Sequence, residues 1–254
     1  MKNSLHLLVA LLFALPGFSQ YQNVMISDVS SPNEPSICLN PRNPNQVIAA
    51  ANTDKYFVSS DGGFTWFPGT LTSPGYRVWG DPCIIVDTAG DFYFLHLSYV
   101  TGGPWIDRIY CQKYDFDSNI WSDGSYMGKN GEKAQDKEWA VVDSATNNIY
   151  VTWTQFDHYG TSDTTKFSNI HFSMSIDAGE TWSDAIQINE VSGNCEDDDE
   201  TTEGAVPVVG PNGEIYVAWA GPAGIVFDRS YDQGETWLDE DIFIDSQPGG
   251  WTYD

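Results

Sequence analysis

The chain has 254 residues, of which 36 are acidic and 11 are basic, and its formal net charge is −25. A field of this sign repels nucleic acids and anionic membrane surfaces, so neither is expected as a partner. Aromatic side chains make up 14% of the residues, which is untypical of a disordered chain. We therefore expect a folded protein that binds cations or neutral ligands.

Residues 1–20 have the pattern of a secretory signal. Lys2 supplies the positive charge, residues 5–15 are mostly apolar, and a small or polar stretch ends near Gln20. The apolar run is too short to cross a bilayer. We expect a protein secreted to the extracellular or periplasmic space without membrane insertion, and a single domain over residues 21–254.

The rest of the sequence alternates apolar and polar residues over short stretches between turn residues, which is typical of antiparallel strands. The strands fall into four groups of four, and no stretch has helical periodicity. The first two groups are 34–39, 46–52, 55–60 and 65–71, then 82–87, 92–99, 108–114 and a strand near Trp121. The last two are 139–143, 148–155, 169–175 and 181–188, then 204–209, 214–220, 224–230 and 236–244.

One pattern, Ser-x-Asp-x-Gly-x-Thr-Trp, recurs at residues 59–66, 175–182 and 230–237. Successive Asp residues of the pattern are 116 and 55 residues apart, and a degenerate copy lies at residues 115–121. A long fixed period indicates a repeat architecture. Asp can accept backbone N–H groups within a turn and Gly permits a positive φ, so the pattern predicts a turn between the third and fourth strands of each repeat. We expect Thr and Trp to restart a strand.

Repeated four-stranded units predict an all-β fold, the β-propeller. Four blades fit, and residues 249–254 resemble the start of a fifth. Because a ring must close to hide its strand edges, we expect the chain to be a fragment of a longer ring of six blades. The alternative is an open ring, or one that is completed by oligomerisation.

Cys38 and Cys83 fall on the first strands of adjacent repeats, which favours a disulfide between them in an exported protein. Free buried thiols are the alternative. Together with Cys111 and Cys195, their spacings fit no zinc pattern.

The repeated turns, the blade length and the export signal together resemble the sialidase-like superfamily, in particular its propellers with bacterial neuraminidase repeats, or Asp-boxes. The resemblance covers residues 34–254. It implies a propeller fold, but such propellers include sialidases, other glycoside hydrolases and non-catalytic receptors.

Sialidases of this superfamily hold the sugar carboxylate with three arginines. The resemblance places the first at Asn33 to Pro35, where a glutamate stands instead, and the second near Ala218 to Ala220, where no arginine occurs. Glu203 matches the family's glutamate that partners a nucleophilic tyrosine. We therefore expect no true sialidase activity.

An acidic residue opens the first strand of each blade. First strands line the channel of a propeller, so these acids would ring the channel mouth on the face away from the Asp-boxes. They are Glu34, Asp81, Asp136 with Glu138, Glu203 and Asp254. Oxygen ligands at Glu34, Asp81, Asp136 and Glu203 could bind calcium. Glu203, Asp81 and Asp136 could instead be catalytic acids and bases on a glycosidic bond. The alternative interpretation is that the acids only cap loops.

Aromatic and histidine side chains near the same face are candidates for binding a sugar, because their rings can stack on it. They are Tyr76, Trp79, His96, Trp105, His158 and Trp219. Packing between blades is the alternative for Trp219, and a buried core position for His96. Two functions follow. The first is a secreted propeller that binds an extracellular glycan or protein on its channel face. The alternative is a glycoside hydrolase that acts on a neutral glycan.

Overall fold

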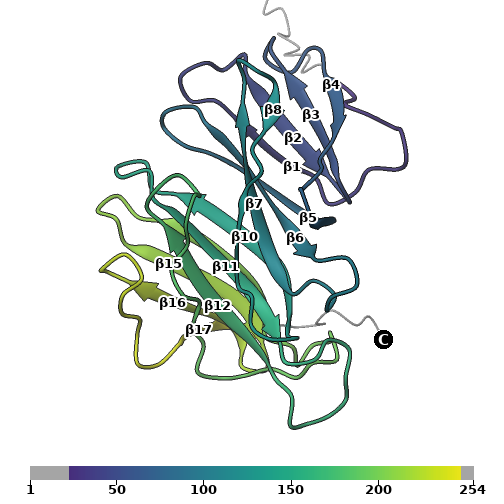
Figure 1. Ribbon diagram of the computed structural model, residues 1–254. Coiled ribbons are helices and arrows are strands. Elements are labelled where there is room, and N and C mark those ends of the chain that lie inside the picture. Colours follow the sequence, from purple (N-terminus) through teal and green to yellow (C-terminus); the bar gives the residue numbers. More distant parts are fainter. Residues whose placement is uncertain (1–22, 247–254) are drawn as a thin grey trace, which may run out of the picture.

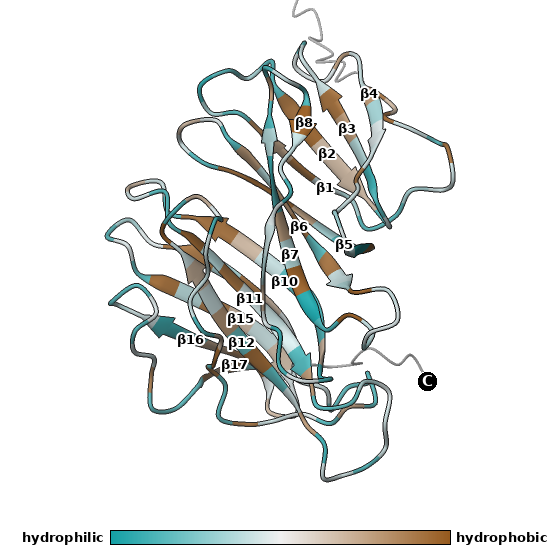
Figure 2. Ribbon diagram, viewed as in Figure 1, coloured by the Kyte–Doolittle hydropathy of each residue, from teal (hydrophilic) through white to brown (hydrophobic). Residues whose placement is uncertain are grey.

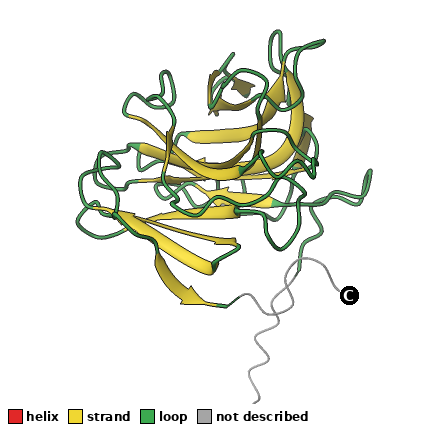
Figure 3. Ribbon diagram, turned by 90° about the horizontal axis from the view of Figure 1, so that it is seen from below, coloured by secondary structure: helices red, strands yellow, loops and turns green. Residues whose placement is uncertain are grey.

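The computed structural model describes residues 23–246. Every regular element in this range is a β-strand (Figure 3). Among these residues, no helix is long and apolar enough to cross a membrane. The expected export signal at residues 1–20 and the expected fifth-blade strand at residues 249–254 lie outside the described residues.

The strands form four antiparallel sheets, which we call blades 1 to 4 (Figure 1). Blade 1 contains β1 (Ser36–Leu39), β2 (Val47–Ala51), β3 (Lys55–Ser59) and β4 (Phe67–Thr70). Blade 2 contains β5 (Arg77–Val86), β6 (Phe92–Tyr99), β7 (Arg108–Asp115) and β8 (Ile120–Trp121), and β9 (Ser125–Met127) also pairs with β7. Blade 3 contains β10 (Ala134–Val142), β11 (Ile149–Phe156), β12 (Ser168–Ser175) and β13 (Ile186–Gln187). Blade 4 contains β14 (Glu203–Val209), β15 (Ile215–Gly221), β16 (Gly224–Ser230) and β17 (Ile242–Asp245).

The first strands of the blades lie next to one another. β1 contacts β5, β5 contacts β10, and β10 contacts β14. The blades spread outward from this row, with blade 1 at the upper right of Figure 1 and blade 4 at the lower left. The predicted all-β propeller architecture, with four four-stranded blades, is confirmed.

The core lies between adjacent blades, along their middle strands (Figure 2). Ile48 and Phe94 pack between blades 1 and 2, Leu95 and Trp153 between blades 2 and 3, and Trp219 between blades 3 and 4. β6 and β11 are buried on both faces because a blade covers each side, which is why their sequences alternate weakly.

The predicted turn between the third and fourth strands is confirmed in blades 1, 3 and 4. In blade 1, Asp61 Oδ1 accepts the Thr65 N–H at 2.9 Å, and Asp61 Oδ2 accepts the Thr65 hydroxyl at 2.6 Å. The Ser59 hydroxyl accepts the Gly63 N–H at 2.8 Å. The same contacts recur around Asp177 and Asp232. The bonds from Thr65 lower the pKa of Asp61 to about 2.

The strands after these turns begin later than predicted. β13 begins at Ile186 and β17 at Ile242, although Thr181 and Thr236 were expected to restart the strands. The hydroxyl and N–H of each Thr are already bonded to the turn Asp, so the chain leaves the turn before it can join the sheet.

In blades 2, 3 and 4, the tryptophan after the third strand contacts the blade before it. Trp237 lies 5.1 Å from Phe172 of β12, measured between ring centroids, and Trp121 lies 5.5 Å from Tyr56 of β3. Trp182 Nε1 donates to Ser125 Oγ of blade 2 at 2.7 Å. The turns therefore fasten successive blades together.

The four cysteines are free thiols, so the alternative to the Cys38–Cys83 disulfide is the one observed. The Cys38 thiol instead donates to the carbonyl oxygen of Ile84 on the neighbouring strand at 3.1 Å. Burial raises the pKa of Cys83 well above its usual range.

A substitution at Gly234 tests the contact between turn and blade. A Cβ at Gly234 would lie 2.4 Å from Phe172 Cε1, whereas one at Gly213 would meet nothing within 4 Å, and the two φ angles are similar at +92° and +88°. Both alanine variants carry the same backbone strain. We expect Gly234→Ala to lose about 1 to 3 kcal/mol more stability in urea unfolding than Gly213→Ala, because only it overpacks the blade interface. Equal losses would contradict the contact.

Candidate functional site

The blades have two distinct ends. In blade 1, Ser36 pairs with Ala50 at the end where β1 begins, and Val47 pairs with Ser59 at the end where the Asp61 turn lies. The starts of the first strands therefore lie on the face opposite the repeated turns, as predicted. We call this face the channel mouth.

Each blade has a left-handed residue in its first strand or, in blade 1, two residues before it. The four are Glu34 (φ 48°), Asp81 (φ 51°), Lys137 (φ 51°) and Gly204 (φ 75°). The pairing of first and second strands shifts register around this position in blades 2, 3 and 4. Side chains other than glycine rarely adopt this backbone, and such residues cluster at functional sites.

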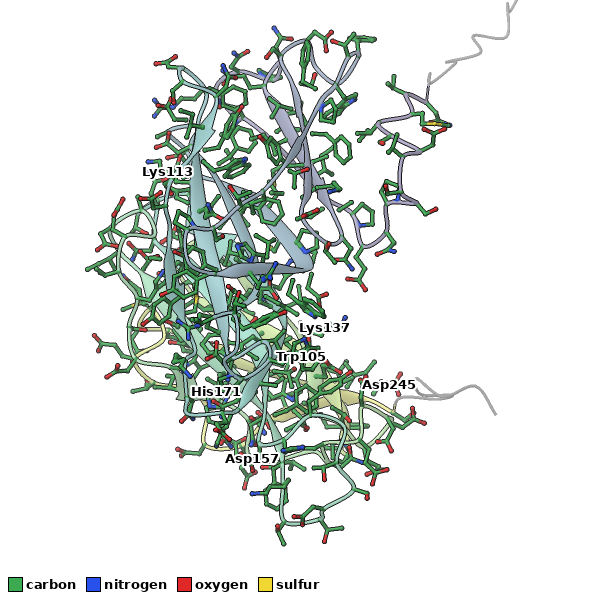
Figure 4. The ribbon with its side chains drawn as sticks, turned by 45° about the vertical axis from the view of Figure 1, so that its right-hand side comes forward. Trp105, Lys113, Lys137, Asp157, His171 and Asp245 are labelled. Carbon is green, nitrogen blue, oxygen red and sulfur yellow. The ribbon has the colours of Figure 1, made fainter. Side chains whose placement is uncertain are left out.

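These four residues line one cavity of about 360 Å³. Trp139, Glu138 and the prolines Pro35 and Pro82 complete its wall. Residues from four blades thus meet at one hollow in the channel mouth. Figure 4 shows Lys137 in the same region of the molecule as Trp105.

Lys137 is the positive charge at the centre of this cavity. Its Nζ lies 3.1 Å from Asp81 Oδ2 and 3.8 Å from Glu34 Oε1. Burial alone would lower the pKa of Lys137, but Asp81 and Asp136 raise it above its usual range.

Asn52 connects the two acids on the other side. Its Nδ2 donates to Glu34 Oε2 at 2.6 Å, and its Oδ1 accepts the Asp81 N–H at 2.8 Å. We call Glu34, Asn52, Asp81 and Lys137 the channel-mouth site.

Three further acids lie beneath this site and are buried. They are Asp136, Glu138 and Glu203. Neither carboxyl oxygen of Glu138 or of Glu203 has a hydrogen-bond partner among the described residues. Burial, and then the charge of Asp81, raises the pKa of Asp136 to about 7. Burial, and then Asp136, raises that of Glu203 to about 9, and burial raises that of Glu138 far above its usual range.

The predicted ring of Glu34, Asp81, Asp136 and Glu203 is therefore divided. Glu34 and Asp81 are themselves the left-handed residues of blades 1 and 2, and they line the cavity. Asp136 and Glu203 each come one residue before the left-handed residue of their blade, and both are buried. Lys137 stands where blade 3 was expected to present an acid. Spacing alone does not show which side chain faces the cavity at a bulge. In blades 1 and 2 the left-handed residue is followed by a proline, as Glu34-Pro35 and Asp81-Pro82, and Lys137 occupies the equivalent position in blade 3.

The geometry does not support the expected calcium site. Within residues 23–246, no group of three or more His, Cys, Asp or Glu side chains is arranged to hold a metal ion. Lys137 supplies the positive charge between Glu34 and Asp81 that a cation would have supplied.

Two of the predicted ligand-binding residues, His96 and Trp219, are buried in the core, so the structure agrees with the alternative interpretation of each. His96 is fully buried, its Nδ1 lies 2.8 Å from the Leu97 carbonyl oxygen, and burial lowers its pKa to about 4. Trp219 is buried between blades 3 and 4. Tyr76 is half-buried, and the Arg108 guanidinium lies over its ring at 4.9 Å from the ring centroid.

The other predicted rings remain accessible. Trp79 and Trp105 are 42% and 41% exposed, and their ring centroids lie 6.1 Å apart. His158 is exposed and lines a separate hollow with Lys133, Asp157 and other residues. The Tyr159 hydroxyl donates to Asp197 Oδ2 at 2.5 Å, and the charges of Asp136 and Glu203 act on Tyr159.

No protein-family model matches the chain, and neither does any curated protein. Several solved structures share its fold. A protein of unknown function from Dyadobacter fermentans is 14% identical with a TM-score of 0.54, over 82% of this chain and 67% of that one. The NanB sialidase of Streptococcus pneumoniae is 12% identical with a TM-score of 0.57, over 89% and 54%. A thermostable family-43 glycoside hydrolase is 13% identical with a TM-score of 0.51, over 84% and 75%.

At these identities the likeness shows the fold alone. The chain has the β-propeller fold that is also seen in sialidases and family-43 glycoside hydrolases. It spans about half the length of the sialidase chains that it matches.

The pKa of Glu203 predicts a pH-dependent stability. A carboxyl whose pKa rises from its ordinary value to about 9 on folding stabilises the fold fully at low pH, and this contribution is lost as the pH rises toward 9. Glu203→Gln resembles the protonated acid and lacks this loss. We expect its stability relative to wild type to rise between pH 5 and pH 9 by more than about 1.4 kcal/mol, which corresponds to one pKa unit.

Thermal or urea unfolding across this pH range measures the difference. Glu214→Gln is the matched control, because hydrogen bonds from Asn212 lower the pKa of Glu214, and its relative stability should not rise. A flat difference for Glu203→Gln would show that Glu203 is ionised in the fold.

Proposed function

We propose that the protein is a secreted propeller that binds a neutral glycan at its channel mouth. The observation that carries the proposal is the 360 Å³ cavity in which Glu34, Asp81 and Lys137 meet from three blades beside Trp139. Sugar hydroxyls both donate and accept hydrogen bonds. A cavity that combines carboxylate acceptors, an ammonium donor and an aromatic ring has the groups needed to orient a sugar.

The charges of the site support a neutral rather than an acidic sugar. Lys137 is the basic residue that lines the cavity, and its ammonium group already forms ion pairs with Asp81 and Glu34. Binding a sugar carboxylate would require bidentate donors of the kind that arginine provides. Arg108 cannot serve, because it is buried and bidentate to Asp107 at 2.7 and 3.0 Å.

Hydrolysis of a neutral glycan is the second candidate. Burial, and then the charge of Asp136, raises the pKa of Glu203 to about 9, which is the direction that a general acid of glycoside hydrolysis needs, and Asp136 or Asp81 would serve as the base. In that reaction the acid would protonate the glycosidic oxygen while the base activates water. Both oxygens of Glu203 are shielded from solvent, however, and this favours binding without chemistry.

Titration with neutral oligosaccharides tests the proposed binding. We expect xylohexaose, cellohexaose or a galactohexaose to bind wild type, and the double variant Asp81→Asn with Lys137→Gln to bind about tenfold or more weakly, because charge-assisted hydrogen bonds are lost. Asp117→Asn, in an exposed loop at the opposite end of blade 2, is the control and should bind as wild type does. Undiminished binding by the double variant would contradict the site, and capture of a protein ligand with no glycan bound would contradict the ligand class.

Activity assays distinguish binding from catalysis. We expect no fluorophore release from a fluorogenic sialoside and no new reducing ends from the neutral hexasaccharides. If neutral hexasaccharides are cleaved and Glu203→Gln abolishes the cleavage, the hydrolase is the correct function. Cleavage of the sialoside would overturn both candidates.

A further inference from the structure

Four aromatic rings form a continuous row beside the channel mouth. Tyr99 lies 5.6 Å from Trp79, Trp79 lies 6.1 Å from Trp105, and Trp105 lies 5.2 Å from Tyr159, measured between ring centroids. All three contacts are edge-to-face. We call these residues the aromatic row.

Trp79 connects the row to the channel-mouth site along the chain. Trp79 is two residues before Asp81 on β5, and the pairing of Arg77 with Tyr99 places the loop after β6 at the same end of the blade. Trp105 belongs to that loop. The row ends at Tyr159, whose hydroxyl donates to Asp197 Oδ2 at 2.5 Å. Burial, and then Asp197, raises the pKa of Tyr159, with smaller contributions from Asp136 and Glu203.

The loop that carries Trp105 is anchored on its other side. Ile106 is fully buried in the core between blades 2 and 3. Asp107 is also buried, and it forms ion pairs with Arg108 at 2.7 Å and with Lys129 at 2.7 Å. Trp105 is thus held in place while two-fifths of it stays exposed, so a ligand that stacks on it would not have to order the loop.

The surroundings of the row favour a sugar chain over an apolar partner. Arg77 shares a strand with Trp79, is exposed, and donates from Nε to Thr101 Oγ1 at 3.1 Å, which leaves its other N–H groups on the same side. Asp197 borders the far end. Exposed rings that are flanked by hydrogen-bonding groups suit the alternating C–H and hydroxyl surfaces of a sugar. The net charge of −25 disfavours an anionic chain.

We infer that the aromatic row binds the extension of an oligosaccharide whose terminal sugar occupies the channel-mouth site. This inference rests on the proposed function and makes the ligand an extended neutral glycan of at least three sugars rather than a monosaccharide. The channel-mouth site determines which terminal sugar is accepted, and the row supplies affinity that grows with chain length.

The test is a length series measured by calorimetric titration with gluco-, xylo- and galacto-oligosaccharides of one, three and six sugars. For wild type, affinity for the preferred series should rise with length. Trp105→Ala and Trp79→Ala should each weaken binding of the hexasaccharide about tenfold, as for other exposed tryptophan anchors, and should weaken binding of the monosaccharide far less. Trp105→Phe keeps a ring and should restore most of the loss. Phe64→Ala, which removes an exposed ring on the opposite face, should change nothing.

The outcomes separate this inference from the proposed function. If the tryptophan variants bind the hexasaccharide as wild type does while the double variant Asp81→Asn with Lys137→Gln does not, the inference is wrong and the channel-mouth site stands. An equal loss at every chain length would also overturn it, because the row would then act on the terminal sugar. If wild type binds no oligosaccharide of any length, both proposals fail.

Discussion

The left-handed residue within or just before each first strand determines which side chains reach the cavity. A residue in this conformation leaves the regular pleat, and the strand register shifts beside it. Glu34, Asp81 and Lys137 share one cavity for this reason. The left-handed backbone of each such non-glycine residue costs about 1 to 3 kcal/mol of folding free energy, and it persists only where the surrounding contacts hold the backbone in place. Here the contacts between adjacent first strands provide that constraint.

The same constraint separates the acids into two electrostatic layers. In the outer layer, Asp81 and Lys137 form an ion pair at 3.1 Å that lines the cavity and is available to a polar ligand. In the inner layer, burial raises the pKa of Asp136 and Glu203. A neutral carboxyl costs less free energy to bury than an ionised one, so the raised pKa offsets the cost of burying these acids without an ion-pair partner. The site thus holds several acids at close quarters in a highly acidic protein, with one lysine as the positive charge that lines the cavity.

Features set by hydrogen bonds between residues close in sequence were predictable from the sequence. Features set by the register shift in the first strands of blades 2, 3 and 4 were not. The turns at Asp61, Asp177 and Asp232 follow from local hydrogen bonding, and their spacing was enough to predict the blades. Trp79 and Trp105 lie close together because the topology brings the start of β5 and the loop after β6 to the same end of blade 2, and their role in binding stays a prediction. Lys137 and the burial of Glu203 could not be found, because one extra residue in the bulge reverses which side chains face inward. His96 failed as a ligand because the strand position of a histidine does not reveal whether another blade covers it.

A structure of the protein soaked with the neutral hexasaccharide that it binds best would test the central claim most directly. We expect the terminal sugar between Asp81 and Lys137 in the 360 Å³ cavity, with the next sugars continuing over Trp79 and Trp105. A hexasaccharide bound away from the cavity, with Lys137 still paired to Asp81 and Glu34 and no sugar in contact with them, would contradict the account.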